Sequence, residues 1–177
     1  MRHHALHRLR RTGFITRSAA ALSGAGEAAF ALGDYALALR YLSAAPGDVG
    51  ADLRSTAAAV LGRDPLQPHL GAAVRRRRIT GVLTDVVRAA DSCLAGRVPP
   101  DDAGTAAVRQ RRDEAARTPW LTSGPRRPAR PADRDDLEEA LVLAARLAGG
   151  LAEAGCPSTA LQRALPLIAK RHELALQ

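Results

Sequence analysis

The sequence is poor in aromatic residues. They make up 3% of its 177 residues, with two phenylalanines, two tyrosines and one tryptophan. The core must therefore be built from alanine and leucine, which bury less area per residue than aromatic rings do. Such a core favours shallow pockets over a deep cleft, so we expect no bound cofactor.

Lysine is nearly absent and asparagine is missing altogether. Lys170 is the only lysine among 26 basic residues, and the others are arginine. This arginine-rich composition is typical of codon usage in a GC-rich, bacterial genome, which weakens any argument from the chemistry of a single arginine. The net charge of +8 suits nucleic acid, an anionic membrane surface or an acidic protein, and it does not bear on the fold.

The chain also has few cysteines and no long apolar run. Cys93 and Cys156 are far apart and do not form a CxxC motif. Two such cysteines in a chain of this size predict free, partly buried thiols and a reducing cytoplasm. No apolar run approaches the roughly 18 residues that a membrane span needs, which predicts a soluble chain.

Residues 1–17 are basic. The first 26 residues contain five arginines, three histidines and no acid. Two interpretations stay open, namely a basic N-terminal arm on a cytoplasmic protein and an organelle transit peptide, which has this composition.

The segment 24–46, GAGEAAFALGDYALALRYLSAAP, predicts two short antiparallel helices. Gly33 ends the first helix, because glycine adopts the left-handed C-cap conformation at little cost. Asp34 caps the second helix by accepting a hydrogen bond from its first turn. Helical spacing places a narrow apolar face on that helix, made of Ala38, Leu39, Leu42 and Ala45.

This hairpin resembles a single tetratricopeptide repeat over about residues 22–46. The resemblance is carried by Gly26, Ala28, Gly33, Asp34, Tyr35, Ala38, Leu39 and Tyr41. The sequence departs from the family at Leu22, where a large aromatic is expected, and at Pro46, which comes early. Nothing recurs at a spacing of about 34 residues, so the pattern indicates one repeat-like pair and no array. An ordinary helix hairpin without kinship to that family is the alternative.

The remaining chain predicts further helices. The apolar stripe over 71–94 favours a long helix over a strand at 79–87, because the stripe continues past Ala90. We therefore predict an all-α fold of antiparallel helix hairpins, a TPR-like helical bundle of six to seven helices. Its expected parts are a helical domain at 18–117, a Pro/Arg-rich linker at 118–132 and a C-terminal helical hairpin at 133–177.

Runs of arginine mark a candidate nucleic-acid surface. Arg75, Arg76, Arg77 and Arg78 open the long helix, where they oppose its dipole and call for negative charge nearby. Four alternatives stay open for the surroundings of this charge, namely acids at 133–139, phosphate, an acidic partner and solvation by water. A second group lies on the helix 101–117 and consists of Arg109, Arg111 and Arg112. Nucleic-acid binding is thus one hypothesis, although few aromatics are available for base stacking.

Three residues are candidates for contact with a protein partner. Tyr41 and its neighbour Arg40 lie on the second helix of the hairpin, where we expect Tyr41 at the surface and Tyr35 packed at the turn. Trp120, the only tryptophan, lies in the linker. It either anchors a partner, as tryptophans at interfaces do, or folds back onto its own domain.

No motif for catalysis or metal binding stands out. HExxH, GxSxG and the P-loop pattern are missing from the sequence, and the acid clusters at helix starts are explained by capping. We therefore predict no enzyme and no metal site, but a helical protein–protein interaction module. It would act as a small adaptor of a larger assembly, such as a bacterial conflict or regulatory system, or by self-association. The alternative is a basic nucleic-acid-binding helical protein.

Overall fold

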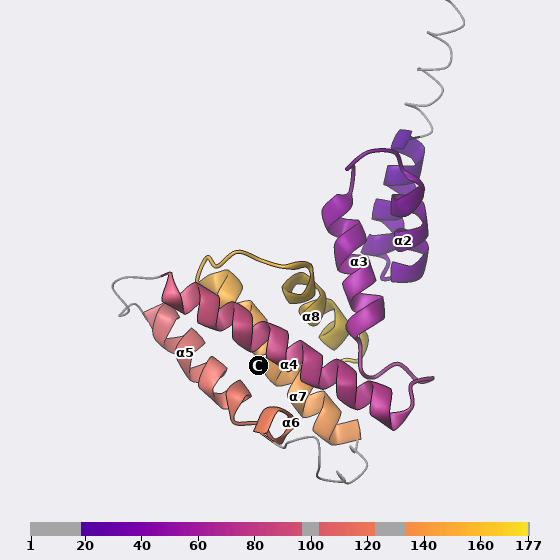
Figure 1. Ribbon diagram of the computed structural model, residues 1–177. Helices are drawn as coiled ribbons and strands as arrows, with labels where there is room; N and C mark the ends of the chain where they lie inside the picture. Colours follow the sequence, from indigo (N-terminus) through magenta and orange to yellow (C-terminus); the bar gives the residue numbers. More distant parts are fainter. Residues whose placement is uncertain (1–18, 97–102, 123–133, 177) are drawn as a thin grey trace, which may run out of the picture. The chain divides into compact units, whose positions relative to one another are not determined.

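A computed structural model describes residues 19–96, 103–122 and 134–176 of the chain, and every regular element in these ranges is an α-helix (Figure 1). The predicted all-α class is confirmed. The described residues form one helix at 19–31 and seven more, labelled α2 to α8. This total exceeds the predicted six to seven because α6 (Pro119–Thr122) is a separate four-residue helix within the predicted linker. None of the described helices has the length and hydropathy to cross a bilayer.

The chain divides into two compact units, residues 1–61 and 62–177. The first holds the helix 19–31, α2 (Tyr35–Ala44) and most of α3 (Ala51–Arg63). The second holds α4 (Ala72–Ala95), α5 (Ala103–Ala116), α6, α7 (Arg134–Glu153) and α8 (Ala160–Arg171). The helices of the predicted C-terminal hairpin thus share a unit with the long helix α4. The predicted arm at 1–17 and the linker residues 123–132 lie outside the described residues.

The turn of the first unit follows the sequence prediction. Gly33 has a φ of +80°, the left-handed conformation expected of a glycine C-cap. Asp34 caps α2, because its Oδ1 accepts a hydrogen bond of 3.0 Å from the backbone N–H of Leu37. A local signal of two residues therefore fixes where one helix ends and the next begins.

The two helices of the hairpin approach closely at Gly26. A Cβ on Gly26 would lie 2.6 Å from Cγ of Leu42, so a larger side chain cannot fit without movement. The predicted burial of Ala38 and Leu42 is confirmed, since both are 0% exposed. Tyr35 is buried too, with its ring edge-on to Phe30 at a centroid distance of 5.3 Å.

Leu39 departs from the predicted inward face. It is only partly buried, whereas Tyr35, Ala38, Leu42 and Ala45 are buried. These four residues follow steps of three and four along the helix and form one stripe, and Leu39 lies at the edge of that stripe. The inward face is therefore centred between Ala38 and Leu42.

We expect Gly26→Val to lower the free energy of unfolding by about 1–3 kcal/mol, because the added methyls overpack the contact with Leu42. Gly24→Ala is the matched control: a Cβ there meets nothing within 4 Å, so the change should stabilise the helix by about 0.5–1 kcal/mol. Chemical denaturation followed by circular dichroism measures both. Equal stability of the two variants would contradict the close approach.

Helix α7 is the centre of the second unit. It lies against α4, α5 and α8 (Figure 1). Its buried residues are mostly alanine and leucine, namely Leu137, Ala140, Leu141, Ala144, Ala145, Leu147, Ala148, Gly150 and Leu151. The small residues let neighbouring helices come close, while the leucines fill the space between them.

Helix α4 confirms the predicted long helix and rules out the strand alternative at 79–87. Its buried residues are Ile79, Val82, Leu83, Val86 and Ala90. Val74, which belongs to the predicted apolar stripe, is an exception with 37% of its surface exposed. It lies in the first turn of the helix, ahead of the buried stripe, which begins at Ile79.

The two cysteines form a disulfide. Cys93, near the end of α4, is bonded to Cys156, which follows α7, and their Cα atoms are 5.9 Å apart. The prediction of two free thiols is wrong, because a spacing of 63 residues in sequence says nothing about distance once α4 and α7 pack together. The inference of a reducing cytoplasm rested on free thiols and therefore loses its basis.

A buried carboxylate joins the start of the second unit to its last helix. Asp64 is 0% exposed, and His172 Nε2 lies 3.0 and 3.1 Å from its two carboxylate oxygens. The backbone N–H of Leu66 donates to the same carboxylate at 2.9 Å. Because His172 is the C-cap of α8, this pair holds the end of α8 against the loop before α4.

We expect His172→Ala to lower the free energy of unfolding by about 1–3 kcal/mol, because it removes the imidazole contact from the buried Asp64 carboxylate, which keeps the backbone N–H of Leu66 and the Arg171 guanidinium at 3.9 Å. His69→Ala is the control, since His69 is exposed on the loop between α3 and α4 and should change stability by less than about 0.5 kcal/mol. Thermal and urea denaturation compare the two variants. A His172→Ala variant as stable as His69→Ala would refute this role.

Candidate functional site

The first candidate surface is the outer face of α2. The guanidinium of Arg40 lies over the ring of Tyr41, with 5.5 Å between Cζ and the ring centroid. Leu37, one turn earlier, extends the same face. Arg40 is exposed, while Leu37 and Tyr41 are partly buried. We call these three residues the α2 outer face. It presents an aromatic ring, a cation and an aliphatic group on a helix whose other face is buried in the hairpin.

Trp120 lies in α6, which packs against α4. The guanidinium of Arg76 sits over its ring, with Cζ 5.6 Å from the ring centroid, and Trp120 is partly buried. The tryptophan of the predicted linker thus contacts its own unit. Sequence reasoning missed this pair, because nothing in the local pattern of either segment signals the other.

The arginine run at the start of α4 is largely engaged within the chain. Arg78 donates to the backbone carbonyl of Asp64 at 2.8 Å, and Arg75 reaches the carbonyl of Pro68 at 3.4 Å. Arg76 lies over Trp120, and Arg77 is exposed. Carbonyl oxygens and a ring face, both electron-rich, therefore meet the positive charge at this helix start.

One acid of the 133–139 cluster, which was one possible source of counter-charge for this run, pairs within its own helix. Glu138 pairs with Arg134 of its own helix, at 2.6 Å between Nε and Oε1. Asp133 lies outside the described residues. The first turn of α7 carries Asp135 and Asp136, where acids are favoured by the helix dipole.

The arginines of α5 differ from one another in their contacts. Arg112 donates to Asp91 on α4 at 2.7 Å and to Asp113 at 3.0 Å, and these hydrogen bonds to carboxylates raise its pKa. Arg109 is exposed. Arg112 therefore attaches α5 to α4, and it is poorly placed to contact phosphate.

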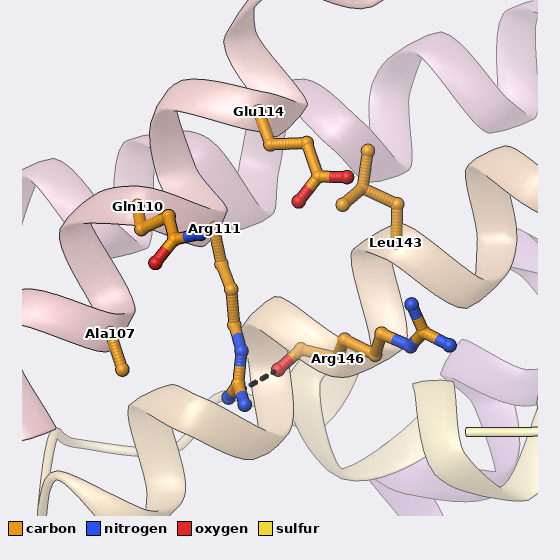
Figure 2. Close-up of a pocket in the computed structure, with 6 residues that line it drawn as sticks. All are labelled: Ala107, Gln110, Arg111, Glu114, Leu143 and Arg146. Atoms are coloured by element: carbon orange, nitrogen blue, oxygen red, sulfur yellow. Dashed lines mark hydrogen bonds between the residues drawn. The ribbon is translucent and has the colours of Figure 1, made fainter. Parts of the chain in front are cut away.

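A shallow hollow of about 300 Å³ lies between α5 and α7 (Figure 2). Its lining residues are Ala107, Gln110, Arg111, Glu114, Leu143 and Arg146. Arg111 crosses it and donates to the carbonyl of Arg146 at 3.4 Å, and its guanidinium lies 3.9 Å from Glu153. Among the described residues there is no group of three or more His, Cys, Asp or Glu side chains that would hold a metal ion.

No family model, curated protein or solved structure gives a significant match to this chain. The resemblance of residues 22–46 to a tetratricopeptide repeat therefore stays a prediction, because a glycine-capped turn and a close helix approach fit an ordinary helix hairpin equally well.

We expect the affinity for nucleic acid to depend only weakly on salt concentration. Of the seven candidate arginines, Arg77 and Arg109 are the two exposed ones. Two phosphate contacts predict a slope of about −1.8 for log K against log salt on duplex DNA. Fluorescence anisotropy of a labelled duplex between low and moderate salt measures this slope. A slope of about −4 or steeper would contradict a nucleic-acid surface limited to Arg77 and Arg109.

Proposed function

We propose that this protein is a non-catalytic interaction module that binds a protein partner through the α2 outer face. The observation that carries the proposal is the Arg40–Tyr41 stack on a helix whose opposite stripe is buried. Tyrosine and arginine are enriched among residues that dominate binding energy at interfaces. The face offers both, already stacked on each other before a partner arrives.

The hairpin that supports this face is well ordered by its own contacts. Gly26 allows the helix 19–31 to press against Leu42, and Asp34 fixes the first turn of α2. Helix α3 contributes a further contact, because Arg54 donates to the backbone carbonyl of Leu42 at 3.3 Å. A helix held in this way loses little conformational freedom on binding, which favours affinity.

The charge of the chain indicates what kind of partner it would meet. Arg40 is exposed, and the chain carries a net charge of +8, so an acidic protein surface is the best complement. We propose a small adaptor within a larger assembly as the biological form of this activity. Self-association of two copies is the second form of the same proposal, in which the α2 outer face would meet acidic groups of another copy.

A photo-cross-linking amino acid placed at position 41 tests the proposal in the native host. We expect one abundant protein adduct from position 41 and none from position 58, since Ala58 is exposed on α3 of the same unit and serves as the control. Mass spectrometry identifies the adduct, and an adduct with the chain itself reveals self-association. The same adducts from both positions, or none from position 41, would contradict the proposal.

With the partner purified, we expect Tyr41→Ala to weaken binding about 30-fold, as hot-spot truncations do, and Tyr41→Phe to keep most of the affinity because the ring remains under Arg40. Calorimetric titration measures both variants, and circular dichroism checks that each is folded. Unchanged affinity of Tyr41→Ala would place the interface elsewhere.

A further inference from the structure

Helix α8 is attached to the rest of its unit at both ends. At its C-terminal end, His172 contacts the buried Asp64. Before its N-terminal end, Cys156 is bonded to Cys93 of α4. Between these two points α8 packs on α7, and its Leu165 and Ile168 are fully buried. The attachment through Cys156 is a disulfide, which thiols can reduce. The attachment through His172 is a noncovalent contact, which thiols do not affect.

The two cysteines of the disulfide differ in exposure. Cys156 is 9% exposed, and its backbone N–H donates to the carbonyl of Leu151 at 2.9 Å. Cys93 is more exposed, on the last turns of α4. Cys93 is therefore the more accessible of the two residues, and attack of a small thiol on its Sγ would make the sulfur of Cys156 the leaving group.

The core of the unit does not depend on the disulfide for its apolar contacts. Fully buried side chains on α4, α7 and α8 continue through the interior, among them Leu83, Leu141 and Leu165. We therefore expect that loss of the bond releases the connection between α7 and α8 from the end of α4, while the packed helices stay in place. The freed stretch is short and includes Gly155, whose φ is +68°, and the capping residue Thr159.

We propose that the Cys93–Cys156 bond is a reversible thiol switch that controls the order of the α7–α8 connection and of the first turn of α8. In the oxidised chain the connection is fixed to the end of α4. In the reduced chain it opens locally, while His172 and the packing on α7 keep the rest of α8 attached.

The chemistry is thiol–disulfide exchange with a small-molecule thiol such as glutathione. Its thiolate attacks Sγ of Cys93, the bond between the two cysteines breaks, and Cys156 leaves as a thiolate that takes up a proton. A second thiol molecule then attacks the mixed disulfide at its small-molecule sulfur, which releases Cys93 as a thiol and yields the small-molecule disulfide. Two electrons pass from two thiol molecules to the protein, and the reverse reaction restores the bond.

Hydrogen exchange of the full-length oxidised and glutathione-reduced protein, with alkylation and mass spectrometry to count thiols, tests the switch. We expect glutathione to reduce the bond without denaturant and exchange in residues 154–163 to rise about tenfold or more, as local opening requires. Exchange at residues 79–90 of α4 and in the hairpin 26–42 should stay within about twofold. The double variant Cys93→Ala/Cys156→Ala should show the reduced pattern in both buffers, and Ser92→Ala should respond as the parent does.

Three results would overturn the proposal. Reduction that occurs only in denaturant would show a bond closed to thiols. Unchanged exchange in residues 154–163 after complete reduction would show that the bond controls nothing there. Fast exchange throughout residues 62–177 would show a bond that the fold requires, and not a switch.

Discussion

The fold depends on close approach between helices that carry small side chains. With few aromatic rings available, the chain cannot fill wide gaps, so its helices must come near one another. Gly26 against Leu42 does this in the first unit, and the alanines of α7 do it in the second. A single dispersion contact is weak, and many such contacts form only where helices lie close together.

Such a core buries little area per residue, and polar and covalent links supplement it. In the second unit, Asp64 meets His172 and Cys93 is bonded to Cys156. Arg63 and Asp85 form an ion pair at 3.1 Å, with both side chains partly exposed. Exposed pairs contribute little, whereas a buried carboxylate that loses a hydrogen-bond partner is costly, so within the described residues we expect the Asp64–His172 contact to contribute more than the Arg63–Asp85 pair.

Contacts within the chain also determine which arginines are available to bind other molecules. A composition rich in arginine suggests a basic surface, yet many of the guanidiniums are occupied by carbonyls, carboxylates and a tryptophan ring. Arg40 is exposed, as Arg77 and Arg109 are, and it also stacks on Tyr41 at the surface. The proposal of a partner-binding face on α2 follows from this pairing of an exposed cation with an aromatic ring more than from total charge.

Sequence alone determined the helices, their main boundaries and most of the inward faces. The turn at Gly33 and Asp34, the burial of Ala38 and the long helix α4 all follow from residues within a few positions of each other. Capping and helical periodicity are local effects, and a single sequence records them. Leu39 and Val74 show the limit of periodicity. Periodicity locates the apolar stripe of a helix, but it does not determine how wide the buried part is or where the neighbouring helix stops covering it.

Only the tertiary structure decided which distant residues meet. The Cys93–Cys156 bond, the Asp64–His172 contact and the Arg76–Trp120 stack each join segments whose local patterns do not refer to one another. Their partners are set by how α4, α7 and α8 pack, and that packing is the sum of many small contacts along three helices. No single pair of residues encodes such a sum, so the candidate site on α2 was visible in the sequence while the partners of Trp120 and of most of the arginines were not.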